Sequence, residues 1–77
     1  MSAFRRKALT LYRSVVLHTV DGNSFVGVLV GVYPDGYVLR HASALVPERT
    51  AIVGDLVVPT RNAAWFQHDV PDDLIPS

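Results

Sequence analysis

The segment from Phe25 to Tyr33, with the sequence FVGVLVGVY, constrains the fold more than any other part of the chain. Every residue in it except Gly27 and Gly31 is apolar or aromatic. Side chains alternate across a strand, so one face carries only valines and the other carries the aromatics, Leu29 and both glycines. A strand apolar on both faces is typical of a barrel or sandwich, and glycines inside it indicate a bend or a close backbone approach. The segment therefore predicts a long, bent strand at the centre of a small barrel.

The size of the chain limits how much core it can bury. It has 77 residues, of which 49% are hydrophobic and 18% charged, so we expect one globular domain. A domain this small buries only about 60% of its unfolded surface and usually needs further stabilisation. The chain contains no cysteine, which excludes disulfides and thiolate metal sites. Assembly with further copies is therefore the expected source of additional stability.

The charges are balanced in number but uneven along the chain. The formal net charge is zero, which argues against strong non-specific nucleic-acid binding by a single subunit. Basic residues gather near the start and acidic residues near the end: Arg5, Arg6, Lys7 and Arg13, then Asp69, Asp72 and Asp73. The termini either serve solubility alone or, in an assembly, concentrate each charge on its own surface. With no secretory signal and no membrane span of roughly 20 apolar residues, we expect a cytoplasmic protein without a membrane partner.

Hydrophobic periodicity and turn residues predict the order of the elements. A short helix is expected over residues 3–13, capped by Ser2 and too short to be stable unless it packs on the domain. Five strands follow, at 14–20, 24–33, 37–42, 51–58 (with a start nearer Gly54 as the alternative) and 63–68, and most of the links between them are tight turns. The fold class expected is mainly β: a short N-terminal α-helix, then a strongly bent five-stranded antiparallel SH3-like barrel. The domain covers residues 1–68, and residues 69–77 form an acidic tail.

Two ordered groups of residues resemble the motifs of the Sm and Sm-like family. The first is Asp21-Gly22 followed by Phe25, Gly27 and Leu29, and it is similar to the first Sm motif with its acidic-Gly turn and bent strand. The second is similar to the other Sm motif and comprises Gly54-Asp55-Leu56-Val57-Val58, a four-residue turn and Ala63-Ala64-Trp65-Phe66. The resemblance covers about residues 3–68. The run of Val-Val-Pro and Ala-Trp-Phe-Gln is also similar to small Sm-like proteins encoded by bacteriophages of actinobacteria.

The resemblance implies a homo-oligomeric ring of six or seven subunits. In such a ring the fourth strand of one subunit pairs with the fifth strand of the next, which consumes both open edges. The turns after the second and fourth strands line the central pore. The chain departs from the family at both turns: Tyr33-Pro34-Asp35-Gly36-Tyr37 is short and lacks the family's Asn, and Pro59-Thr60-Arg61-Asn62 replaces an Arg-Gly pair.

Six residues are candidates for contact with nucleic acid. Arg61 and Asn62 offer phosphate and base contacts, while Asp35 and Tyr37 offer an acceptor and a stacking ring. Arg5 and Arg6 offer a basic helix face. The alternative is that Asp35 and Asn62 only form turns, Tyr37 only packs, and the arginines are solvated. Trp65 and Phe66 are adjacent, so one should enter the core while the other meets a neighbour or stacks on a base.

Catalytic and metal-binding motifs do not emerge from the sequence. His18, His41 and His68 lie on separate expected strands without thiolate support, so we expect no metal and no cofactor. No nucleophile motif, phosphate loop or carboxylate pair is present, and an enzyme is not expected. Two functions stay open: a ring that binds RNA or single-stranded nucleic acid, or a structural, protein-binding ring such as a bacteriophage virion or assembly component. In the second case the cytoplasm would be that of a bacterial host.

Overall fold

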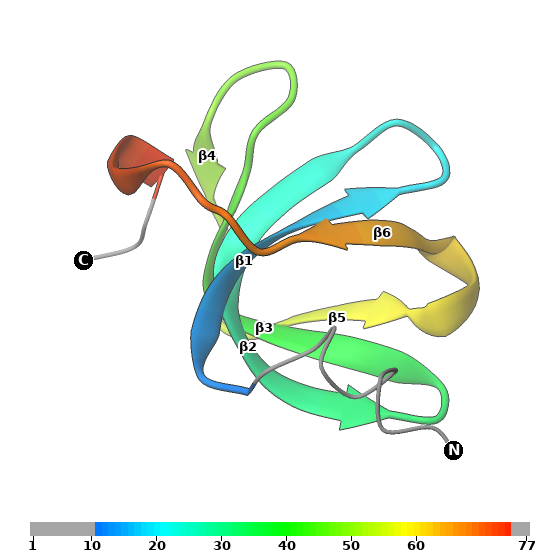
Figure 1. The fold of residues 1–77 in the computed structure, drawn as a ribbon. Coiled ribbons are helices and arrows are strands. Elements are labelled where there is room, and N and C mark those ends of the chain that lie inside the picture. Colours follow the sequence, from blue (N-terminus) through cyan, green and yellow to red (C-terminus); the bar gives the residue numbers. More distant parts are fainter. Residues whose placement is uncertain (1–10, 75–77) are drawn as a thin grey trace.

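The computed structural model describes residues 11–74, which form a strongly curved antiparallel sheet (Figure 1). The elements are β1 (Arg13–Thr19), β2 (Ser24–Tyr33), β3 (Gly36–Ala44), β4 (Thr50–Ala51), β5 (Leu56–Pro59), the 3-10 helix η1 (Thr60–Asn62), β6 (Ala63–Gln67) and the 3-10 helix η2 (Asp72–Leu74). The strand order is β4-β3-β2-β1-β6, and β5 also pairs with β3. The mainly β, antiparallel architecture is as the sequence predicts.

The long strand β2 is the centre of the sheet. Its bounds agree with the predicted strand over residues 24–33, and it pairs with β1 on one edge and β3 on the other. The ladder with β3 shifts register between Val26 and Val28 and again between Leu29 and Gly31. A Cβ at Gly27 would lie 3.2 Å from the Cα of Ala42 and 3.2 Å from the carbonyl oxygen of Arg40. Gly27 therefore permits the close approach of β3 that the sequence indicated.

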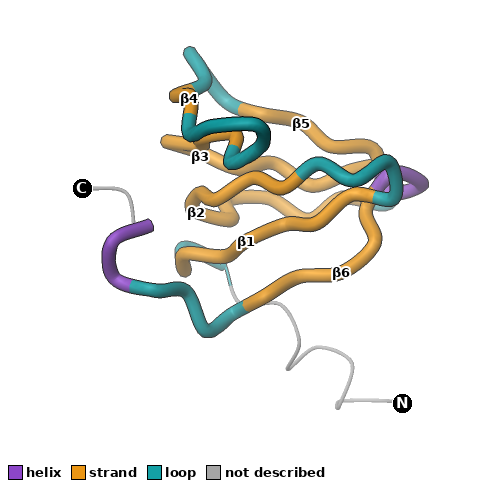
Figure 2. Tube along the Cα trace, turned by 90° about the horizontal axis from the view of Figure 1, so that it is seen from above, coloured by secondary structure: helices purple, strands orange, loops and turns teal. Residues whose placement is uncertain are grey.

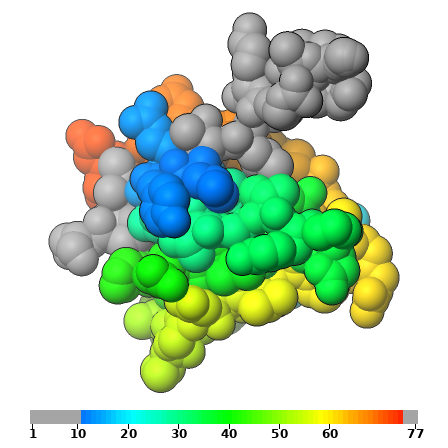
Figure 3. All heavy atoms as spheres, turned by 90° about the horizontal axis from the view of Figure 1, so that it is seen from below, coloured from blue at the N-terminus to red at the C-terminus, as the bar shows by residue number. Residues whose placement is uncertain are grey.

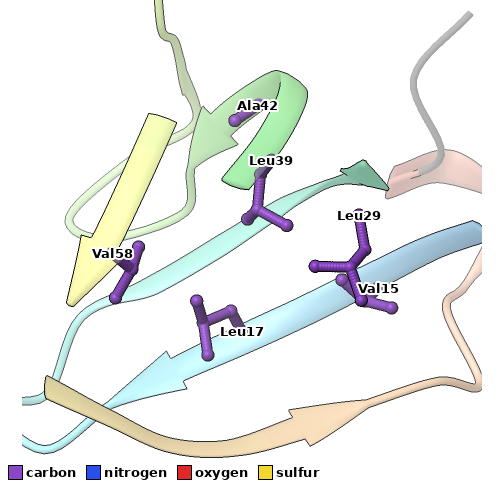
Figure 4. Close-up of a cluster of buried hydrophobic side chains, with 6 residues drawn as sticks. All are labelled: Val15, Leu17, Leu29, Leu39, Ala42 and Val58. Carbon is purple, nitrogen blue, oxygen red and sulfur yellow. The ribbon is translucent and has the colours of Figure 1, made fainter. Parts of the chain in front are cut away.

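The core lies on the inner face of the curved sheet (Figure 4). It is a cluster of small aliphatic side chains from four strands, namely Val15, Leu17, Leu29, Leu39, Ala42 and Val58. Phe25 and Phe66 pack against this cluster and are partly buried. The opposite, all-valine face of β2 is covered unevenly, since Val26 is fully buried whereas Val32 is 46% exposed.

The predicted fourth strand over residues 51–58 is wrong in its extent, and the alternative start nearer Gly54 comes closer to β5. Residues 51–58 do not form one strand: β4 and β5 pair with different parts of β3, with Ser43 opposite Ala51 and Leu39 opposite Leu56. The backbone between them turns at Gly54, which has a φ of 81°, and His41 on β3 has a φ of 56°. Two left-handed residues on facing segments interrupt the ladder, so the structure has six strands where the sequence predicted five.

The sheet does not close into a complete barrel. β5 pairs with β3 and β6 pairs with β1, and β5 and β6 form no ladder with each other in the part of the chain described. Figure 2 shows the two strands at opposite margins of the sheet, joined through η1. The predicted turn at 59–62 is this single 3-10 turn, and it leads from β5, which is paired with β3, to β6, which is paired with β1. Among the described residues, both strands therefore keep one open edge.

The predicted N-terminal helix, with Arg5 and Arg6, lies largely outside the described residues. The helix does not extend to residue 13, because residues 11 and 12 form a turn and Arg13 begins β1. Tyr12 has a φ of 63°, and its N–H donates to the carbonyl oxygen of Leu29 at 2.6 Å. Within residues 11–74 the helical segments are the two 3-10 turns, and no helix there is long and apolar enough to cross a membrane.

The close approach at Gly27 predicts a cost for any added side-chain atom. We expect Gly27→Ala to lower the free energy of unfolding by about 1–3 kcal/mol, because its methyl group would press on β3 backbone that cannot rotate away. Chemical denaturation monitored by circular dichroism measures this loss. Val32→Ala, on the exposed end of the same strand, should cost clearly less, and an equal loss in both variants would contradict the assignment.

Candidate functional site

The 3-10 helix η1 links the turns at the ends of two hairpins. At its start, the N–H of Thr60 donates to the carbonyl oxygen of Asp35 at 3.1 Å, and the Thr60 hydroxyl donates to that of Pro34 at 3.2 Å. At its end, the carbonyl oxygen of Asn62 accepts from the N–H of Val20 at 2.8 Å. We call residues 34–35 and 60–62 the η1 corner. Figure 3 shows the molecule from below, where β3 and β5 lie side by side. Their paired residues Gly36 and Pro59 adjoin this corner.

The η1 corner brings together three of the six candidate residues. Asp35 and Arg61 are exposed, and Asn62 is half-buried. Hydrogen bonds hold the backbone on both sides of Arg61, and within residues 11–74 its side chain is in no salt bridge. The corner therefore presents one guanidinium and one carboxylate to solvent from adjacent turns. Such a pair can contact a phosphate and an exocyclic base amine.

Tyr37 occupies a different position. Its ring packs edge-on against Phe66, with a centroid separation of 4.9 Å and an interplanar angle of 77°, and the residue is half-buried against the core. This contact agrees with the alternative stated in the sequence analysis, in which Tyr37 serves packing. Phe66 is thus the member of the Trp65-Phe66 pair that enters the core, which confirms that one of the two does so. Base stacking by Tyr37 would require it to leave this contact.

Trp65 remains on the surface beside a histidine. Its side chain is 56% exposed, and its ring stacks on His18 with centroids 4.0 Å apart and planes inclined by 16°. The two residues face each other across the β1–β6 ladder. The His18 ring is held by Ser24 on one side, at 2.9 Å, and by Gln67 on the other, at 3.3 Å. This support fixes the orientation of the exposed indole next to the open edge of β6.

The turn between β1 and β2 carries an ionised carboxylate. The Thr19 hydroxyl donates to Oδ1 of Asp21, and the N–H of Asn23 donates to the Thr19 hydroxyl at 3.0 Å. The bond from Thr19 is the main cause that lowers the pKa of Asp21, and bonds from Asn23 lower it further. The same turn lines a pocket with β5 and Asn62. Asp21 and Asn23 are further candidate residues, of which the sequence analysis named only Asp21, as part of the acidic-Gly turn of the Sm-like motif.

The remaining charged groups show no catalytic arrangement. Arg40 lies 3.2 Å from Asp55 in an exposed ion pair, and the hydrogen bond and charge of Asp55 raise the pKa of Arg40. Arg49 donates to the carbonyl oxygens of Asp73 and Leu74, so the middle of the predicted tail contacts the loop before β4. Among residues 11–74, no three His, Asp or Glu side chains are grouped as a metal ion requires.

Comparison with known proteins identifies a shared fold. No family model matches the chain, and no curated protein matches it. A chain in the crystal structure of the NatC complex bound to CoA aligns with 90% of this chain and 90% of its own length, with a TM-score of 0.70 and 18% sequence identity. At this identity the likeness shows the architecture alone.

Sequence reasoning missed the groupings that depend on strand register. Thr19, Asp21 and Asn23 come next to Leu56, Pro59 and Asn62 only because η1 hydrogen-bonds to the β1–β2 turn. The alternation of Thr19, Asp21 and Asn23 on one side of the turn was a usable signal. The His18–Trp65 stack follows from the register of β1 with β6, which the sequence does not define.

The hydrogen bond between Thr19 and Asp21 predicts a change in titration. Thr19→Val removes the donor, so the pKa of Asp21 should rise towards its ordinary value, as measured by NMR titration of the carboxyl carbon. The wild-type carboxylate, with its lowered pKa, favours the folded state above its unfolded pKa, and this contribution disappears as the pH falls through the folded pKa. Thr60→Val, the same change in η1, should leave Asp21 unaltered. An unshifted Asp21 in Thr19→Val would contradict the assignment.

Proposed function

We propose that this chain is a subunit of an Sm-like ring that binds RNA or single-stranded nucleic acid at the η1 corner. The observation that carries the proposal is the pair of hydrogen bonds from Thr60 and Val20, which hold exposed Arg61 beside exposed Asp35. Under the Sm resemblance these two turns face the central pore. A ring would set one Arg61 from each subunit around the same pore, so that several phosphates could be contacted at once although each chain is neutral.

The open edges of β5 and β6 support self-assembly. Unpaired strand edges invite pairing with another chain, and here they carry exposed apolar side chains, with Val57 62% and Trp65 56% exposed. Pairing of β5 in one subunit with β6 in the next would cover both. Closure after six or seven copies is the expectation from the resemblance. The stacked, hydrogen-bonded His18 would hold Trp65 ready for this contact.

The chemistry at the η1 corner suits binding rather than catalysis. Arg61 would contact a phosphate or stack on a base, and Asp35 would accept a hydrogen bond from an exocyclic amine. Asn62 is a weaker contributor, because it is half-buried towards the β1–β2 turn. Tyr37 would contribute mainly by packing beneath the β2–β3 turn.

A structural or protein-binding ring, such as a bacteriophage virion or assembly component, is the second candidate. The observation that favours it is the exposed carboxylate of Asp35 beside Arg61, which opposes a second phosphate at the same corner. The zero net charge of the chain also favours a protein ligand over nucleic acid. This candidate shares the ring and differs only in its ligand.

The edge-pairing proposal predicts the mass of the assembly. Native mass spectrometry of the purified chain should give a species of six or seven subunits. Val57→Asp places a charge on the open edge of β5 and should yield monomers or small oligomers, with folding verified by circular dichroism. Val32→Asp, the same change at the exposed end of β2, should retain the ring. A monomeric wild-type chain would contradict both candidate functions.

Nucleic-acid binding at the corner is tested with short oligo-U and oligo-A. Fluorescence anisotropy should show binding at about 50 mM salt that weakens steeply towards about 200 mM. Arg61→Ala should lower the affinity roughly tenfold or more, because a charge-assisted contact is worth about 1.5–3 kcal/mol.

Arg13→Ala is the matched control, since Arg13 is an exposed arginine at the start of β1. It should bind as the wild type does. Equal losses in the two variants would contradict a specific role for Arg61. No binding of either oligonucleotide at the lower salt would exclude the nucleic-acid proposal and leave the protein-binding ring.

A further inference from the structure

A pocket beside the β1–β2 turn is not used by the proposed contacts of Arg61 and Asp35. It has a volume of about 160 Å³ and lies between this turn, β5 and Asn62. Pockets for whole drug-sized ligands occupy roughly 300–1,000 Å³. The size therefore suits one side chain or one small ring rather than an extended ligand.

One wall of the pocket is polar and negatively charged. It is formed by Thr19, Asp21, Asn23 and Asn62. An ionised carboxylate offers only acceptors, and each carboxamide adds an acceptor oxygen. No lysine or arginine of residues 11–74 pairs with Asp21. The hydrogen bond from Thr19 keeps this carboxylate ionised and in place. The wall is therefore suited to a cation that can donate several hydrogen bonds.

The other wall is apolar. Phe25, Leu56 and Pro59 line it, together with the side of β5 that carries Val58. A guanidinium is planar, weakly hydrated and able to stack on aromatic and apolar surfaces while donating at its edge. An ammonium is compact and strongly hydrated, so it gains less from such a wall. A phosphate-bearing ligand is disfavoured by the charge of Asp21.

We propose that the pocket bounded by Asp21, Phe25, Leu56 and Asn62 binds an arginine side chain presented by a protein partner. The guanidinium lies against the apolar wall and donates to the Asp21 carboxylate, and its stem leaves the pocket through the open side. This site is separate from the corner contacts of Arg61 and requires no nucleic acid. It gives the assembly a means of selecting a basic protein segment.

The test is an NMR titration of the ¹⁵N-labelled full chain with N-acetyl-arginine amide. Amide shifts should concentrate at residues 19–23, 56–58 and 62. The neutral isostere N-acetyl-citrulline amide should bind at least about tenfold more weakly, because it lacks the charge that strengthens the hydrogen bonds. Equal binding of the two probes, or shifts confined to other residues, would overturn the proposal.

Asp21→Asn is the matching variant, since asparagine is well tolerated in a hairpin turn and retains an acceptor for Thr19. It should weaken N-acetyl-arginine amide about tenfold. Asp35→Asn, the same change in the neighbouring turn, should bind the probe normally. Unchanged binding by Asp21→Asn would overturn the proposal.

Two further titrations separate this site from the proposed function. Arg61→Ala should bind N-acetyl-arginine amide as the wild type does, and Asp21→Asn should bind the oligonucleotides at least as tightly as the wild type. Loss of one activity therefore does not imply loss of the other. Adenosine shifting the same amides while N-acetyl-arginine amide shifts none would overturn the arginine assignment in favour of a nucleobase.

Discussion

The backbone of β2 hydrogen-bonds to a neighbour along both of its edges, and the positions of the other strands depend on this double pairing. On its other edge β1 pairs with β6, and β3 pairs with both β4 and β5. The close approach at Gly27 lets the sheet curve around a core of small aliphatic side chains. Since β5 and β6 are attached at opposite sides of this curved sheet, η1 must span the gap between them (Figure 2).

The function proposed for the chain arises from that gap. Within residues 11–74, β5 and β6 form no ladder with each other, and η1 between them hydrogen-bonds to the turns of two hairpins. The same geometry leaves two edges open within residues 11–74 and places exposed Arg61 in a backbone turn that is hydrogen-bonded on both sides. The proposed assembly and the proposed ligand contact thus both rest on one structural constraint. The pocket bounded by Asp21, Phe25, Leu56 and Asn62 adjoins the end of η1 and is a separate, negatively charged recess.

The elements that depend on local pattern were predictable, and those that depend on register were not. The bounds of β2 followed from its apolar run and its flanking turns, and the strand over 63–68 is confirmed as β6 at 63–67. The strand over 51–58 was wrong, because Gly54 and His41 take left-handed conformations that composition does not reveal. Asp35 and Arg61 were expected near each other, whereas the contact of Tyr37 with Phe66 depends on how β3 and β6 meet across the core.

The central claim is that the open edges of β5 and β6 are paired between copies in solution. Hydrogen exchange of the assembled chain tests it directly, residue by residue. In antiparallel strands alternate amides point to opposite edges, so within one copy about half of the β5 and β6 amides lack a strand partner. The account predicts that these outward amides exchange as slowly as those bonded to β3 and β1. Rapid exchange confined to the outward amides, in wild-type protein at the concentration of the native mass measurement, would contradict it.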